Sequence, residues 1–134
     1  MSPKIVSYIT VSIFLVLNCA IAHGCGQKDK SAKEQVDIVT ISVSPNRDYL
    51  ATVYIVWGGG AAGYVYRVVN VRKHGERFDP KKGIVLHMSS KSNPTVAWDG
   101  NEHLVIQHSK AATIYKQERQ WGDKVKVKVD YLQN

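Results

Sequence analysis

The sequence predicts an all-β protein, in which a single small antiparallel meander forms a sandwich or a curved, partly closed sheet. Apolar and polar residues alternate along several stretches after residue 36, which is the pattern of strands with one buried face. Clusters of Gly, Pro, Asn and Asp separate these stretches at the spacing of turns. Helical spacing with capping residues is not found in this region. About seven strands are expected, after a signal peptide and a short disordered tether.

The N-terminus has the three-part pattern of a secretory signal peptide. Lys4 supplies the positive charge, residues 5–22 are mainly apolar, and small residues follow. Ala20-Ile21-Ala22 fits cleavage by ordinary signal peptidase, which predicts a soluble periplasmic or secreted protein. The apolar run is also close to the roughly 20 residues of a membrane-spanning helix, so a retained anchor is a further alternative.

A second cleavage pattern makes Cys25 the mature N-terminus and the expected site of lipid (palmitate) attachment. Residues 22–25, Ala-His-Gly-Cys, resemble the bacterial lipoprotein box, although their first two positions do not hold its usual residues. Cys19 lies inside the signal, so Cys25 is left as a lone cysteine whose thiol requires an explanation. Lipidation supplies one, and a free thiol on a flexible tail is the alternative. We expect a signal peptide over residues 1–24 and a membrane-anchored lipoprotein of the cell envelope.

The part after the signal divides into a tether and one domain. Residues 25–35 are polar with few apolar members, so they cannot bury a core and are expected to be disordered. Residues 36–134 have the length of one β domain. Removal of Lys4 with the signal lowers the formal charge from +7 to +6. A basic exported domain suits anionic lipid, an acidic protein partner or solubility alone, whereas the compartment disfavours nucleic acid.

The first three strands are expected between residues 36 and 72. Apolar residues alternate with Thr and Ser over 36–43, and Pro and Asn mark a turn at 44–48. Residues 49–57 are apolar at nearly every position, which predicts a strand covered on both faces. Residues 64–72 form a second long strand, and the two pair as an antiparallel hairpin around the glycine loop at 58–63.

The middle of the domain is expected to hold shorter strands. Residues 73–82 are a turn followed by a loop that contains Pro80. Residues 83–88 form a short strand. The stretches 95–98 and 103–107 flank an Asp-Gly turn and form a second hairpin.

The C-terminal part is expected to add two strands. Residues 111–120 contain β-branched and aromatic residues, which predicts a strand followed by a turn. Residues 124–131 alternate Lys or Asp with Val or Tyr, so apolar side chains point inward and cations outward. Lysines in such a strand also protect an exposed edge against aggregation.

The order of several motifs resembles an uncharacterised family of small bacterial lipoproteins, known only as a domain of unknown function. These motifs are Ser44-Pro45-Asn46 before an apolar strand, the turn at residues 59–64, Val96-Ala97-Trp98-Asp99 before Leu104-Val105-Ile106, and the terminal alternating strand. The resemblance covers roughly residues 40–131 by motif order. It implies a lipoprotein location and a compact β domain, and it implies no activity.

Residue patterns for catalysis, cofactors or metals are not found. The glycine loop lacks the Gly-Lys-Ser/Thr sequence and the following helix of a phosphate-binding loop. His103 and His108 are an odd number of residues apart, so they face opposite sides of one strand, and the histidines and cysteines lack zinc-site spacing. The Gly-x-Ser-x-Gly elbow of many hydrolases is missing, and the carboxylates cluster nowhere except at Asp99 and Glu102 in a hairpin loop. We expect no enzyme activity, no cofactor and no metal site.

Candidate partner contacts surround the glycine loop. Trp57, Tyr64, Arg67 and Arg72 combine aromatic and arginine side chains, which are enriched at binding hot spots. The alternative is that the aromatic residues fill the small core. The resulting prediction is a non-enzymatic envelope lipoprotein that binds an acidic protein partner, with an immunity or inhibitor protein as a specific version. The alternative function is a structural or lipid-surface module. The sequence does not define the oligomeric state.

Overall fold

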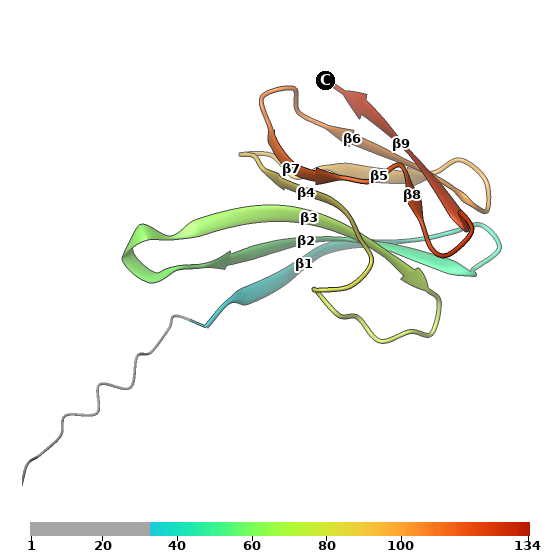
Figure 1. The fold of residues 1–134 in the computed structure, drawn as a ribbon, viewed down its shortest axis with the longest axis horizontal. Coiled ribbons are helices and arrows are strands. Elements are labelled where there is room, and N and C mark those ends of the chain that lie inside the picture. The colour runs from blue at the N-terminus through green and yellow to red at the C-terminus, as the bar shows by residue number, and fades with distance from the viewer. Residues whose placement is uncertain (1–32) are drawn as a thin grey trace, which may run out of the picture.

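The computed structural model describes residues 33–134, which form two β-sheets packed face to face (Figure 1). The predicted all-β class is confirmed. The five-stranded sheet has the order β1 (Gln35–Val43), β2 (Tyr49–Gly58), β3 (Tyr64–Lys73), β4 (Ile84–Ser89) and β7 (Thr113–Gln117). The four-stranded sheet has the order β5 (Thr95–Trp98), β6 (His103–His108), β9 (Val127–Gln133) and β8 (Gln120–Trp121).

The predicted signal peptide over 1–24, the lipid site Cys25 and most of the tether over 25–35 lie outside the described residues. Within residues 33–134, no helix has the length and apolar character needed to cross a membrane. The described chain enters β1 at Gln35, close to the expected start of the domain.

Strands β2 and β3 form the predicted hairpin. Their register is unbroken from the pair Tyr49–Lys73 to the pair Gly58–Tyr64. Between them, a single 3-10 turn, η1 (Gly60–Ala62), follows Gly59, whose φ of 87° is a left-handed conformation that glycine adopts readily. In Figure 1 this hairpin extends to the left beyond β5, β6, β8 and β9.

The main core lies between the two sheets. The pairing of Val53 with Val69 places both side chains on the face that meets the four-stranded sheet, and Leu104 and Val129 reach them from the opposite side. All four side chains are buried. The other buried residues of this core are Ala51, Val71, Val85, Leu86, Met88, Ile106 and Val127.

The C-terminal strand differs from the prediction in three ways. Strand β9 pairs with β6 in parallel, so the meander is not antiparallel throughout. It begins at Val127 instead of residue 124, because Lys124 and Val125 have φ values of 64° and 51° and belong to a turn. Val125 is therefore exposed, although the alternation predicts it to point inward. Strand β9 also lies between β6 and β8, so its lysines do not protect a sheet edge there.

Candidate binding site on the five-stranded sheet

The outer face of the five-stranded sheet, which points away from the four-stranded sheet, carries a second apolar cluster. Tyr54 and Val56 of β2 and Val68 of β3 are buried there, one residue out of phase with the main core. The two long strands are apolar on both faces, as the sequence predicts, but a second sheet covers only one of them. Residues 74–83, which connect β3 to β4, cover one end of the outer face, and we call them the loop.

The Tyr54 side chain, which projects from β2, holds the loop against the outer face of the sheet. Its phenol O–H donates to the backbone oxygen of Pro80 over 2.8 Å. Phe78 packs edge-on against the Tyr54 ring, with centroids 5.2 Å apart. Burial raises the pKa of the Tyr54 phenol well above its usual range, so the group remains a hydrogen-bond donor.

Asn70 and Arg72 hold the loop from β3. The Asn70 Nδ2 group donates to the backbone oxygens of Asp79 and Lys82 over 3.4 and 3.3 Å. Arg72 Nε donates to the backbone oxygen of Glu76 over 3.3 Å. Together with Tyr54, these side chains satisfy four loop carbonyls that lie outside any strand ladder.

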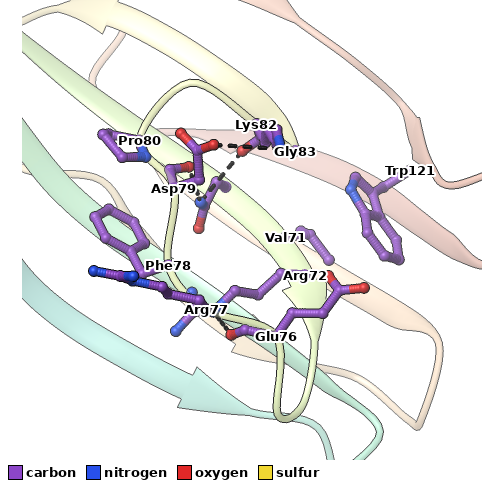
Figure 2. A pocket seen from close by; sticks show the side chains of 11 residues that line it. Val71, Arg72, Glu76, Arg77, Phe78, Asp79, Pro80, Lys82, Gly83 and Trp121 are labelled. Carbon is purple, nitrogen blue, oxygen red and sulfur yellow. Dashed lines mark hydrogen bonds and ion pairs between the residues drawn. The ribbon is translucent and has the colours of Figure 1, made fainter.

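A cavity of about 710 Å³ lies between this loop and β3 (Figure 2). Trp121 lies across the cavity from Phe78 and Pro80. Gly83 forms part of the wall with a φ of +65°, and a Cβ atom there would lie 2.1 Å from the backbone oxygen of Val71. The close approach of the Gly83 backbone to the Val71 backbone of β3 therefore requires glycine at this position.

Arg72 is a buried cation in the wall of this cavity. Its side chain is 9% exposed, its Nη1 donates to the Thr52 hydroxyl, and its guanidinium lies 5.5 Å from the Phe78 ring centroid. Burial lowers the pKa of Arg72 below its usual value, and the nearby Glu76 carboxylate opposes that shift. The guanidinium forms no ion pair within residues 33–134.

Asn70 also lines the cavity and carries an unsatisfied oxygen. The residue is 1% exposed, and its Oδ1 has no hydrogen-bond partner among the described residues. The two bonds from Nδ2 fix the orientation of the amide, so Oδ1 acts as an acceptor in need of a donor. Such a buried unpaired acceptor costs about 1–3 kcal/mol.

At the other end of the outer face, four rings form an aromatic cluster: Tyr64, Tyr66, His87 and Tyr115. Tyr66 stacks on Tyr64 at 5.0 Å and meets His87 and Tyr115 edge-on at 4.7 and 5.5 Å. Tyr115 is 56% exposed. A hollow of about 420 Å³, lined mainly by apolar side chains, adjoins Tyr64, Tyr66 and His87. Burial lowers the pKa of His87, which favours its neutral ring.

The outer edge of the same sheet carries further exposed apolar residues, which we call the β1 strip: Ile38, Ile41 and Val43. Their pairing with Tyr54, Thr52 and Leu50 places them on the outer face. Each is nearly half exposed. Strand β1 contains neither lysine nor proline, the residues that commonly protect an edge, and within residues 33–134 it pairs with β2 alone.

The predicted partner contacts do not form one surface. By register, Trp57 and Tyr64 lie on opposite faces of the hairpin, yet both border a hollow of about 560 Å³ at the glycine loop. Arg67 binds the loop before β5, donating to Asn93 Oδ1 and to the Lys91 backbone oxygen over 3.1 and 3.2 Å.

Arg72 is eight residues from Tyr64 along β3, roughly 26 Å away. Its burial removes it from the surface offered to a partner.

Sequence reasoning missed Asn70, His87 and Tyr115 as site residues. An asparagine inside an apolar strand is a local signal that identifies Asn70, because a buried amide requires partners. His87 and Tyr115 come together through the pairing of β4 with β7, which no local pattern predicts. The described residues contain no group of three or more metal-binding side chains. Comparison with family models, curated proteins and solved structures gives no match for this chain.

Proposed function

We propose that this chain is an exported, lipid-anchored, non-catalytic module that binds a protein partner with the outer face of its five-stranded sheet. The observation that carries the proposal is the aromatic cluster, which the rest of residues 33–134 leaves partly exposed. Tyrosine is among the residues most enriched at the energetic centres of protein interfaces. An exposed apolar surface of this kind commonly marks an interaction site.

The overall positive charge of the chain favours an acidic partner. Next to the cluster, Lys116 is opposite His87 in the sheet and forms an ion pair with Glu118 over 3.7 Å, and Lys81 borders the hollow beside the cluster. Glu34 is the one acidic residue that borders the same hollow. A net positive charge beside an aromatic centre suits a negatively charged protein face, as the immunity or inhibitor version of the proposal requires.

The lipid anchor in this proposal rests on the sequence around Cys25. An anchored module needs only a modest intrinsic affinity if its partner is held at the same membrane, because tethering raises their effective concentration. The competing lipid-surface function depends on the overall positive charge instead of the aromatic cluster.

Site-specific photo-cross-linking of the full chain in its native envelope tests the proposal. A benzophenone amino acid replaces Tyr115, which lies in β7, in one variant and Val125, which lies outside β7, in a matched control. Both residues are about half exposed, so the two variants differ in place and not in accessibility. A discrete protein adduct at position 115 that is missing at position 125 supports partner binding by the outer face. Adducts to lipid alone at both positions support the lipid-surface function and contradict this one.

A further inference from the structure

Within the described part of the chain, two polar groups border the cavity under the loop: an acceptor without a hydrogen-bond partner, Asn70 Oδ1, and a cation without an anion, the hydrogen-bonded guanidinium of Arg72. The buried guanidinium of Arg72 has no anionic partner within residues 33–134, and Asn70 Oδ1 has no donor. Both residues lie on the same face of β3, two positions apart. A buried polar atom without a partner is rare in proteins, and its position in the same cavity as a cation that lacks an anion among the described residues indicates that a bound molecule completes both.

We propose that this cavity binds a small carboxylate that carries an O–H or N–H donor on the neighbouring atom. The carboxylate pairs with the Arg72 guanidinium, for which a planar anion is the natural partner. The adjacent donor satisfies Asn70 Oδ1. The cavity, at about 710 Å³, is within the size range of small-molecule sites and leaves room for the rest of such a ligand.

The site is distinct from the aromatic cluster of the proposed function, although Pro80 borders both the cavity and the hollow beside that cluster. The aromatic cluster lies at the other end of the sheet face, and the lining of the cavity includes none of its four rings. Asn70 Oδ1 is shielded from solvent, so the ligand must displace a side chain of the loop. Arg77 is exposed, borders the cavity and makes no side-chain hydrogen bond within the described residues, so it can move at little cost.

Four small probes separate the two parts of the recognition. Glycolate and glycine carry a carboxylate with a neighbouring O–H or N–H donor, acetate carries the carboxylate alone, and ethylene glycol carries donors without charge. Each is titrated into the ¹⁵N-labelled full chain while the side-chain signals of Asn70, Arg72 and Trp121 are followed by NMR. Glycolate or glycine is expected to shift these signals saturably, with a dissociation constant on the order of 1 mM for so small a ligand.

Acetate is expected to bind at least fivefold more weakly, and ethylene glycol is expected to cause no saturable shift. Preference for glycolate over glycine, or the reverse, identifies the donor as hydroxyl or amine. Absence of saturable shifts with every probe overturns the proposal, as does equal binding of acetate and glycolate, because Asn70 then plays no part.

A pair of variants adds a second test. Arg72→Lys keeps the charge but loses the planar fork, and it is expected to weaken glycolate or glycine binding at least tenfold. Arg119→Lys, at an exposed position outside the cavity lining, is the matched control and is expected to leave binding unchanged. Equal binding by both folded variants contradicts the assigned role of Arg72. If Arg72→Lys does not fold, the probe titrations of the unaltered chain decide the question.

Discussion

The hydrogen bond from Tyr54 to Pro80 offers a direct test of how the loop is held. Tyr54→Phe removes the phenol O–H and leaves the ring that packs against Phe78. A net hydrogen bond contributes about 1 kcal/mol, and an acceptor left without a partner adds to the loss, so we expect a destabilisation of about 1.5 kcal/mol. For a domain of this size, that lowers Tm by roughly 6–12 °C.

The loop itself should open more easily than the domain unfolds. The Lys82 amide donates to the Asp79 backbone oxygen within the loop, so its hydrogen exchange reports local opening. A loss of about 1.4 kcal/mol corresponds to a tenfold increase in the open population, and exchange of the Lys82 amide should rise by about that factor. Differential scanning fluorimetry and amide exchange by NMR measure the two effects.

Tyr131→Phe is the matched control. The Tyr131 phenol is also part-buried, and its oxygen lies 2.8 and 2.7 Å from the backbone oxygens of Val85 and Glu118, away from the loop, so its single O–H donates to one of them or is shared between both. Tyr131→Phe should lower Tm at least as much as Tyr54→Phe does. The exchange rate of the Lys82 amide should then change no more than the loss of global stability accounts for. If Tyr54→Phe changes neither Tm nor Lys82 exchange, packing by Phe78 holds the loop and the reasoning from hydrogen bonds is refuted.

Three further perturbations test the fold and its pH dependence. Gly83→Ala should lower the free energy of unfolding by about 3 kcal/mol or more in a denaturant titration, because the added Cβ meets the Val71 backbone. Gly75→Ala, at a φ of +89° with open space around it, should lower it by only about 1 kcal/mol. Equal losses refute the steric account. Hydrogen bonds from Lys128 and His103 hold the pKa of Asp130 below its usual value. The contribution of Asp130 to stability is therefore present above its pKa in the unfolded state and is lost as the pH falls through its pKa in the folded state. Asp130→Asn should flatten the fall in Tm below about pH 4, and an unchanged acid profile contradicts this. Burial raises the pKa of Tyr54, so as the pH rises the Tyr54 phenol loses its proton in the unfolded state before it does in the folded state, and stability should fall above about pH 10. This alkaline loss should be smaller in Tyr54→Phe. Measurement of Tm up to about pH 11 tests the difference.

The β2–β3 hairpin could be predicted to within one residue at each end. Its strands are apolar at nearly every position, its turn is rich in glycine, and the partners are adjacent in the chain, so the determining interactions are local. The pairing of β6 with β9 could not be predicted in this way, because β7 and β8 lie between them in the sequence. The start of β9 was missed because the positive φ values of Lys124 and Val125 interrupt an alternation that is otherwise regular.

The candidate site was only partly predictable for a related reason. Residue type and exposure to a partner are separate properties, and the fold decides the second. Arg72 has the chemistry of an interface residue, yet the loop and Thr52 enclose it. Tyr115 is exposed because β7 is the last strand of its sheet, and its contact with Tyr66 crosses β4. The order of residue types along the sequence therefore predicts neither the burial of Arg72 nor the exposure of Tyr115.

The loop connects the two parts of the outer face physically. Pro80 borders both the cavity beneath the loop and the hollow beside the aromatic cluster, and the Tyr54 phenol holds its carbonyl. A ligand that displaces loop side chains therefore acts on a segment that also shapes the partner surface. Coupling between the two sites requires that the ligand and the partner favour different positions of this loop, because a ligand without differential affinity shifts no equilibrium. Tyr54→Phe changes the cost of moving the loop without changing a residue that contacts either bound molecule, so it separates this coupling from direct contact.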